Sequence, residues 1–358
     1  MKVCQALAQL GHQVTLLVPG DDSRKGSTPT DLNSLYGLQT LFNVEWLQAR
    51  KIMRRYDFAI SALRHARILR AEVLYVWLLQ SAVAGLLLSL PVILEMHGPP
   101  EGRFGPLLFY LFLRLPGRKR LLVITQALGK ILSQRYGESL VAPILLTAPN
   151  GVEIERYTSL PSPALARKLA GLKEGLTIAC SGHLYTGRGM SLLVELARRF
   201  PKIQFLWLGG RPGDVQFWRE HLAARAVSNV TLLGFIPNDR LPALQAAADI
   251  LLMPYERAIS GSSGGDSGAY ASPMKMFEYM ACQRVILSSD LPVIREVLND
   301  SNSVLCPPGL PDDWARALER VLGDEVLRQR LVSQAWNDVQ AYSWKKRAEK
   351  TLAGFLRE

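Results

Sequence analysis

The segment SPMKMFEYMA, residues 272–281, carries a lysine and a glutamate at helical spacing. Ser272 has the hydroxyl of a helix N-cap and Pro273 suits the first helical position, so the pattern predicts a helix that starts here. Lys275 then lies in the first turn, where the helix dipole opposes a cation. Two interpretations remain open: a surface ion pair with Glu278, or an anion bound by Lys275 and the helix N–H groups, with Glu278 accepting hydrogen bonds from a diol such as a ribose.

A second segment, residues 176–200, has the pattern of a strand, a loop with three glycines and an amphipathic helix. Gly182, Gly187 and Gly189 permit a ligand to approach the backbone closely, and Arg188 lies beside the predicted helix start. A glycine-bearing turn with one cation has the outline of a phosphate-binding loop. The glycine spacing is not the dinucleotide fingerprint, and no acidic residue ends the following strand, which counts against a dinucleotide oxidoreductase.

The elements that position these residues alternate between short β-rich runs and longer helical patterns, which predicts a parallel α/β architecture. The expected strands of the first half are residues 13–19, 58–61, 72–77, 91–97 and 121–126. Those of the second half are residues 176–182, 203–209, 230–235, 249–255 and 284–289. A proline-rich stretch with an Asn-Gly turn, residues 148–163, separates the two sets. We therefore predict domains over residues 1–155 and 156–341, and a C-terminal amphipathic helix within residues 342–358 that packs on either of them.

Two features of the first half are unusual. The chain begins with a predicted helix, residues 2–11, whereas a nucleotide-binding α/β domain usually begins with a strand. Either a first strand is missing upstream or the domain is a reduced variant. Residues 73–94 are apolar and uncharged over a membrane-spanning length. We favour a buried strand, helix and strand, because parallel strands covered on both faces have continuous apolar sequences.

The overall composition limits the class of partner. A length of 358 residues suits two domains, and a formal net charge of +11 favours an anionic partner. No basic motif interleaved with aromatic residues is present, so nucleic acid is not expected. The four cysteines have neither zinc-ligand nor disulfide-framework spacing, and no cleavable leader pattern precedes them, which predicts a cytoplasmic setting. The absence of an Asp-x-Asp pattern predicts no bound metal.

Read in order, these segments form a recognisable series. The run GHLYTGRG, LLVELA, FLWLGG, NVTLLGFIPNDRLPALQAAADILLMPY and SPMKMFEYMACQRVILSSDLPVIREV resembles the nucleotide-sugar half of retaining glycosyltransferases of family 4. PVILEMHG, APNGVEIERY and YSWKKRAEK are similar to one branch of that family, which carries an SPxKxFEYMA motif. The resemblance implies the GT-B fold, with two Rossmann-like domains that face a cleft, the N-terminal one on the acceptor side and here lacking its first strand.

The resemblance also implies roles for individual residues. Glu278 matches a glutamate that holds the nucleotide ribose, and Arg188 stands where a phosphate-binding lysine is usual. Lys275 would supply a second cation to the diphosphate, together with the backbone at Gly182, Gly187, Gly189, Ser272 and Pro273. His97 matches a histidine that faces the donor sugar, with Glu95 orienting it, although a histidine that merely ends a strand is the alternative. The family's other glutamate is replaced by Tyr270, which places sugar contacts in question.

The expected function is therefore a hexosyl-type transferase that moves a sugar from a UDP- or GDP-sugar to a saccharide or lipid-linked acceptor. The resemblance implies retention of configuration, and the charges above suggest that no metal or other cofactor is needed. A truncated or non-catalytic nucleotide-sugar binder is the alternative, motivated by the missing strand and by Tyr270.

Three further segments carry weaker expectations. The loop of residues 98–106, with Arg103, is a candidate for acceptor contacts. Residues 261–268 have the composition of either a mobile loop beside the donor or a plain linker. Residues 107–120 combine an apolar face with basic residues, so the helix there is either a peripheral contact with an anionic membrane or a buried helix with a basic end.

Overall fold

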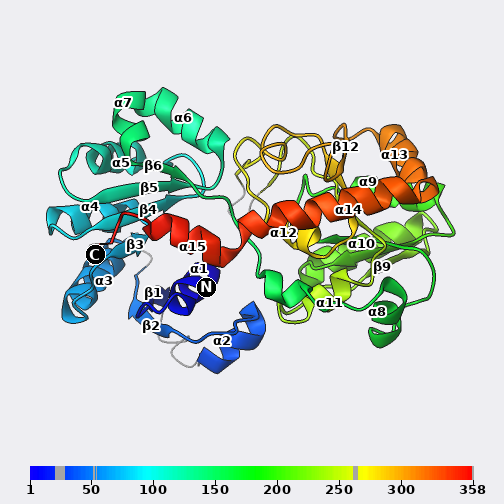
Figure 1. Cartoon of the computed structure of the whole chain (residues 1–358), viewed down its shortest axis with the longest axis horizontal. Coiled ribbons are helices and arrows are strands. Elements are labelled where there is room, and N and C mark those ends of the chain that lie inside the picture. The colour runs from blue at the N-terminus through cyan, green and yellow to red at the C-terminus, as the bar shows by residue number, and fades with distance from the viewer. Residues whose placement is uncertain (21–28, 51–52, 54, 261–264, 357–358) are drawn as a thin grey trace. The chain divides into compact units, whose positions relative to one another are not determined.

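The computed structural model describes residues 1–20, 29–50, 53, 55–260 and 265–356 (Figure 1). The chain divides into two compact units: Met1–Pro149 together with Trp344–Glu358, and Asn150–Ser343. The division therefore falls a few residues before the boundary expected from the sequence. The C-terminal helix belongs to the first unit, which is one of the two placements that the sequence left open.

The second unit is built on one six-stranded sheet in the order β12-β11-β10-β7-β8-β9, in which every adjacent pair is parallel. Its strands are β7 (Thr177–Ser181), β8 (Gln204–Leu208), β9 (Val230–Leu232), β10 (Ile250–Met253), β11 (Val285–Ser289) and β12 (Val304–Cys306). The strands β7, β10 and β11 are buried along their whole length, as expected of parallel strands covered on both faces.

Helices cover this sheet. They are α8 (Pro163–Leu169), α9 (Met190–Arg199), α10 (Pro212–Ala224), α11 (Leu241–Gln245), α12 (Met274–Ala281), α13 (Pro311–Gly323) and α14 (Glu325–Val339), with short 3₁₀ turns η4 (Ile154–Tyr157) and η5 (Gln340–Tyr342). The main apolar core joins the sheet to α9 and α13 around Trp207 and Trp314, both fully buried. This rigid sheet presents the carboxyl ends of its strands, where ligands of open α/β sheets bind.

The first unit contains two separate parallel sheets, β1-β2 and β3-β4-β5-β6. The strands are β1 (Thr15–Gly20), β2 (Asn43–Gln48), β3 (Leu74–Val76), β4 (Val92–Met96), β5 (Lys119–Val123) and β6 (Leu145–Thr147). Among the strands described, β1 and β3 each have a hydrogen-bonded neighbour on one side only. In the described residues the two sheets of this unit are therefore not joined by a common strand.

The helices of the first unit include the C-terminal one. They are α1 (Lys2–Gln9), α2 (Pro29–Tyr36), α3 (Tyr56–Ile68), α4 (Leu79–Leu87), α5 (Gly105–Arg114), α6 (Gln126–Tyr136), α7 (Glu138–Val141) and α15 (Trp344–Leu352), with the 3₁₀ turn η3 (Ala142–Ile144). Trp344 and Ala348 of α15 pack on Val3 and Ala6 of α1. The first and last helices of the chain, α1 and α15, thus share one apolar cluster and lie side by side in Figure 1.

One strand expected from the sequence is wrong, and the apolar stretch of residues 73–94 has the predicted secondary structure. Residues 58–61 lie inside α3, where Phe58, Ala59 and Leu63 are buried on one face of the helix. Residues 73–94 form β3, α4 and β4, as predicted. In the described part of the chain, no helix is long and apolar enough to cross a membrane.

Candidate functional site

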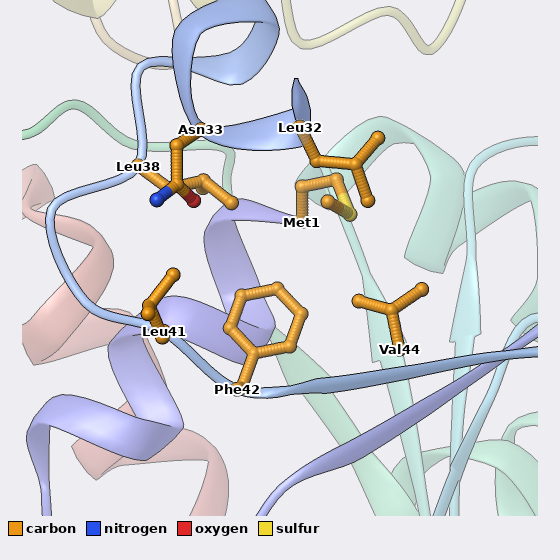
Figure 2. A pocket seen from close by; sticks show the side chains of 7 residues that line it. All are labelled: Met1, Leu32, Asn33, Leu38, Leu41, Phe42 and Val44. Carbon is orange, nitrogen blue, oxygen red and sulfur yellow. The ribbon is translucent and has the colours of Figure 1, made fainter. Parts of the chain in front are cut away.

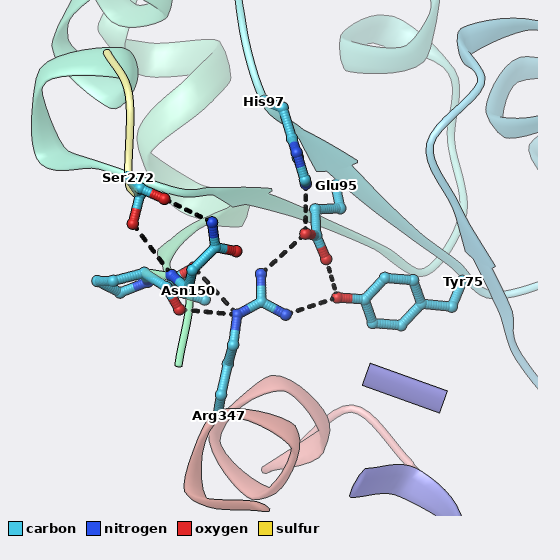
Figure 3. Close-up of polar contacts among 8 residues, drawn as sticks. Tyr75, Glu95, His97, Asn150, Ser272 and Arg347 are labelled. Atoms are coloured by element: carbon cyan, nitrogen blue, oxygen red, sulfur yellow. Dashed lines mark hydrogen bonds and ion pairs between the residues drawn. The ribbon is translucent and has the colours of Figure 1, made fainter. Parts of the chain in front are cut away.

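The start of α12 differs from the predicted one by a single residue. Pro273, with φ −68° and ψ 124°, is the N-cap, and the helix begins at Met274. The Ser272 hydroxyl instead accepts a hydrogen bond from the backbone N–H of Asn150 at 3.2 Å, and the Asn150 amide donates to the Ser272 carbonyl at 2.7 Å (Figure 3). These two bonds fix the approach to the helix, so Ser272 positions α12 without capping it.

Lys275 is 7% exposed, although it lies in the first turn of the helix. Its ammonium nitrogen lies 3.6 Å from the Cys180 sulfur and 4.6 Å from the centre of the Tyr255 ring. In the part of the chain that the structure describes, no carboxylate lies within ion-pair distance of Lys275. A surface pair with Glu278 is therefore the wrong interpretation, and a buried cation without a counter-charge remains.

Arg188 contacts the same aromatic ring. Its guanidinium carbon lies 5.2 Å from the Tyr255 ring centre, and it donates to the Tyr255 hydroxyl at 2.9 Å and to the Ser260 carbonyl at 3.1 Å. Its Nε atom is buried and has no partner among the described atoms. Two cations thus share one ring, whose face offsets part of their charge. The repulsion between them favours an anion nearby.

Further positive charge lies beside this pair. Arg211 stacks on Tyr185, with 5.3 Å between the guanidinium carbon and the ring centre, and Tyr185 stacks on His183. Burial lowers the pKa of His183, and the charges of Arg211 and Arg188 lower it further. The imidazole is therefore expected to be neutral at pH 7, while the guanidinium groups make the carboxyl edge of β7 electropositive.

The three glycines of the loop have different structural roles. A Cβ atom at Gly187 would lie 2.0 Å from the Ala258 carbonyl oxygen, and one at Gly189 would lie 2.0 Å from the Pro254 carbonyl oxygen. Both positions therefore require glycine so that the loop can pack on the segment after β10. At Gly182, where φ is +133°, the nearest atom to such a Cβ would be the Lys275 ammonium nitrogen, 3.7 Å away. Only Gly182 of the three borders the buried cation.

Glu278 is held by a network of neutral polar groups that the sequence did not reveal. The Gln245 amide donates to the Glu278 carboxylate at 2.9 Å and to the Ser181 hydroxyl at 3.3 Å, and its carbonyl accepts from the Tyr157 hydroxyl at 2.9 Å. The Tyr279 hydroxyl in turn contacts Ser181 at 3.0 Å. This network fixes the carboxylate at the second turn of α12, one turn away from Lys275.

In the first unit, His97 follows β4 and its side chain is 52% exposed. Its Nε2 atom lies 2.6 Å from the carboxylate of Glu95, which is 3% exposed. Burial by itself would raise the pKa of Glu95, but the hydrogen bond from His97, the charges of Arg347 and of protonated His97, and the hydrogen bond from Tyr75 lower it to about 2. An ionised carboxylate therefore holds the imidazole, as the predicted orienting role of Glu95 requires.

The structure describes residues 98–106 fully and residues 261–268 in part, the two loops expected near the site. Arg103 lies over the Phe104 ring at 5.5 Å, before α5. Tyr270 donates its hydroxyl to the Asp266 carbonyl at 3.1 Å, and the Asp266 carboxylate accepts from the backbone of Ile259 and Gly268. Residues 261–264 of the predicted loop lie outside the described residues, so its mobility stays a prediction.

The described residues contain no metal-ligand cluster, and a small pocket of the first unit has mostly apolar walls. Within the described residues, no group of three or more His, Cys, Asp or Glu side chains could hold a metal ion. A small pocket in the first unit is lined by mostly apolar side chains, shown in Figure 2: Met1, Leu32, Asn33, Leu38, Leu41, Phe42 and Val44. No titratable side chain lines this pocket, and we assign no chemistry to it.

The chain has the GT-B class of fold, because it consists of two α/β units that are each built on parallel strands. The cation site lies at a strand end of the second unit. Family models match both halves of the chain. Residues 1–156 match Glycosyltransferase Family 4, and residues 175–324 match Glycosyl transferases group 1. The two matches together cover most of the chain, which belongs to this glycosyltransferase family.

Individual relatives are more distant. A phosphatidyl-myo-inositol mannosyltransferase of Mycobacterium leprae is 29% identical over 60% of this chain, but the match spans only 54% of that protein. An alpha-D-kanosaminyltransferase of Streptomyces kanamyceticus is 22% identical over 92% of this chain and 86% of its own. The solved structure of Anabaena Alr3699/HepE in complex with UDP has a TM-score of 0.75 at 16% identity, and the match covers 99% of this chain and 96% of that one.

Proposed function

We propose that this protein transfers a sugar from a nucleoside-diphosphate donor, a UDP- or GDP-sugar, to a saccharide or lipid-linked acceptor. The observation that carries the proposal is the buried ammonium group of Lys275, which has no carboxylate partner among the described residues and lies at the carboxyl edge of a parallel sheet. Burying an unpaired charge is costly, so a site that retains one is suited to a ligand of opposite charge. A diphosphate supplies that charge.

The catalytic contribution follows from where charge develops. Cleavage of the bond between sugar and diphosphate leaves negative charge on the departing phosphate oxygens. Lys275, the unpaired Nε of Arg188, and the backbone N–H groups at the starts of α9 and α12 would stabilise that charge. These fixed donors make a divalent metal unnecessary, and we propose metal-independent transfer with retention and no cofactor beyond the donor itself.

The remaining site residues take the roles implied by their positions. Glu278, held in place by Gln245, would accept hydrogen bonds from the ribose hydroxyl groups. Gly182, next to the Lys275 ammonium nitrogen, would let the diphosphate approach the backbone. His97 of the first unit would contact the transferred sugar through its exposed ring edge. The setting we propose is the cytoplasm, where the four buried, unbridged cysteines would remain reduced.

A panel of thermal unfolding measurements with UDP, GDP, ADP and their sugar conjugates, and with NAD as a negative control, tests the donor class. A ligand present at a hundred times its dissociation constant stabilises the folded state by about 2.7 kcal/mol. We expect one nucleotide family to raise the unfolding temperature, and Lys275→Met and Glu278→Gln to reduce the rise. Lys202→Met, which removes an exposed lysine of the same unit, is the matched control.

Three outcomes would count against parts of this proposal. The Lys275 site would be excluded if no nucleotide raised the unfolding temperature. It would also be excluded if Lys202→Met lost the rise as fully as Lys275→Met. Binding of the donor without release of nucleoside diphosphate, at saturating donor with a panel of sugar acceptors, would support the non-catalytic alternative. Loss of turnover on treatment with EDTA, restored by a divalent ion, would contradict metal independence.

We also propose a peripheral membrane contact through α5. Phe109 and Phe112 are fully buried, but Phe104, Leu107 and Tyr110 are 41–55% exposed on the same segment. The basic end of the segment is less available than expected. Lys119 donates to the Leu113 carbonyl at 2.7 Å, and Arg118 and Arg120 donate to backbone carbonyls that follow α15. Insertion would therefore depend more on apolar side chains than on charge.

Sedimentation with vesicles of phosphatidylglycerol and phosphatidylcholine tests this contact. We expect binding that weakens when Leu107 and Leu111 are both replaced by serine, and that is unchanged in Ile68→Ser, which removes an exposed apolar residue of α3. Absence of binding at both low and moderate salt would exclude the contact.

A further inference from the structure

The Glu95 carboxylate is contacted from three elements of the first unit (Figure 3). Its Oε1 atom lies 2.6 Å from Nε2 of His97 and 3.0 Å from Nη2 of Arg347, a residue of α15. Its Oε2 atom accepts a hydrogen bond from the Tyr75 hydroxyl on β3. The Glu95 and Arg347 side chains are 2% and 4% exposed, so water screens this pair very little.

These contacts determine which nitrogen of the His97 ring carries the proton. An ionised carboxylate can only accept hydrogen bonds. The short contact to Oε1 therefore requires Nε2 to be protonated. In the neutral ring, Nδ1 is then the atom left with a lone pair, on a side chain that is half exposed.

Arg347 and His97 compete for the same carboxylate oxygen. The Nη2–Oε1 contact is an ion pair and not one of the hydrogen bonds of Arg347, so its contribution is chiefly that of charge. With Arg347 in place, the negative charge of Glu95 is already compensated. It therefore stabilises a doubly protonated His97 ring only weakly. Without Arg347, the buried carboxylate would have His97 as its one remaining basic contact among the described side chains around it.

The other groups facing Glu95 do not alter this balance. Tyr75 lies on β3, and burial followed by the charge of Glu95 raises its pKa well above the usual value. Cys4 lies on α1, and burial raises the pKa of its thiol. Both are therefore neutral near pH 7, and the charge around His97 is set by Glu95 and Arg347.

We propose that Arg347 is a positioning residue for the transfer reaction: it compensates the charge of Glu95 and thereby weakens the pull of that carboxylate on a second proton at Nδ1 of the half-exposed His97 ring. This role rests on the proposed function, because it matters only if His97 contacts the substrate. It would make α15, which lies at the opposite end of the sequence, part of the support of the site.

A purely structural role for Arg347 must be separated from this one. Arg347 also donates from Nε to the carbonyls of Ala148 and Pro149, at 3.2 and 2.9 Å, which ties α15 to the end of the first unit. Arg347→Lys keeps the charge and loses most of this geometry. Arg347→Met and Arg347→Gln lose the charge. Lys350→Met removes an exposed charge from the same helix and is the matched control.

The test is an NMR titration of the histidine ring protons in the full chain, with the His97 signal assigned from its absence in His97→Gln. We expect the midpoint of the His97 titration to rise by about one pH unit in Arg347→Met and Arg347→Gln. It should stay near the wild-type midpoint in Arg347→Lys and Lys350→Met, and fall in Glu95→Gln. An unchanged or lower midpoint in the two neutral variants would overturn the proposal.

A double variant keeps the test decisive if the neutral variants fail to fold. Glu95→Gln/Arg347→Met contains neither buried charge and is expected to fold. Because Arg347 acts through Glu95, its His97 midpoint should equal that of Glu95→Gln alone. If the His97 midpoint in the double variant were one pH unit higher than in Glu95→Gln alone, Arg347 would act on His97 without Glu95. That result would overturn the proposed route.

Kinetics separate this inference from the proposed function. If the protein transfers sugar, the acidic limb of the kcat profile should move to higher pH in Arg347→Gln by the same amount as the titration midpoint, with KM for the donor unchanged. If no donor binds or turns over, the proposed function fails while the titration still decides the state of His97.

Discussion

The two units each bury a cation, and the two cations differ in their surroundings. Arg347 in the first unit, 5% exposed, contacts a carboxylate, a phenol and two backbone carbonyls. Lys275 in the second unit, 7% exposed, contacts a thiol and an aromatic ring. Burial alone therefore does not distinguish the structural cation Arg347 from Lys275, for which we propose ligand binding. The contrast indicates that the partners of the charge distinguish them, because an unpaired buried charge is unfavourable until a ligand arrives.

The largest effect expected from this comparison is on folding. Arg347→Met leaves Glu95 as an uncompensated buried charge, which typically costs about 3–5 kcal/mol. Lys275→Met removes an unpaired charge and should leave the free energy of unfolding unchanged or raise it. Urea unfolding of both variants, followed by tryptophan fluorescence and circular dichroism to separate the two units, measures the difference. Equal destabilisation by the two substitutions would break the comparison.

The next effect is the acid sensitivity of the first unit. The pKa of Glu95 is lowered in the folded state from 4.5 to about 2. A depressed carboxyl pKa stabilises the fold above the unfolded value of 4.5, and this contribution is lost as the pH falls towards 2. By linkage it amounts to about 3 kcal/mol. Urea unfolding between pH 6 and about 2.5 should show this loss in the wild type and lack it in Glu95→Gln. The same slope in both proteins would contradict it.

Much of the fold was predictable because buried parallel strands leave a strong local pattern. The strands β4, β5, β7, β8, β10 and β11 were all expected near their observed positions. The strand β2 (NVEWLQ) was missed because polar and charged side chains interrupt it. The three-residue strands β6 and β12 were also missed, although β3 and β9 are equally short and were expected. Residues 58–61 were misassigned because a four-residue apolar window cannot distinguish a strand from one turn of a helix.

The candidate site was predictable only where its signal was local. Lys275 was conspicuous because a lysine in the first turn of a helix opposes the dipole. The partners that hold the site were not, because Asn150 meets Ser272 across 122 residues and Gln245 meets Glu278 across 33. Arg347 reaches Glu95 from the last helix of the chain. Such contacts depend on the packed fold and leave no spacing in the sequence.

A smaller effect is expected on ligand binding in the second unit. A hydrogen bond to a charged group contributes about 1.5–3 kcal/mol, so Lys275→Met should weaken the nucleotide that binds by about 10- to 100-fold. Lys275→Arg should retain part of the affinity because it keeps the charge. Isothermal titration calorimetry with wild type and both variants measures this. Equal affinity in Lys275→Met would mean that the unpaired ammonium group is not the anion site, and the contrast with Arg347 would lose its functional meaning.

The smallest effect concerns the support of α12. Ser272→Ala removes one neutral hydrogen bond, from the Asn150 N–H, and should cost about 1 kcal/mol of stability. Asn150→Ala removes the bond from the side-chain amide to the Ser272 carbonyl and should cost a similar amount. Because Pro273 caps the helix, neither change should shorten α12 itself. If these bonds position Lys275, both variants should weaken nucleotide binding several-fold while leaving the acid transition of the first unit unchanged. Weakened binding with no loss of stability would instead indicate that Ser272 or Asn150 contacts the nucleotide directly, as the sequence first suggested for Ser272.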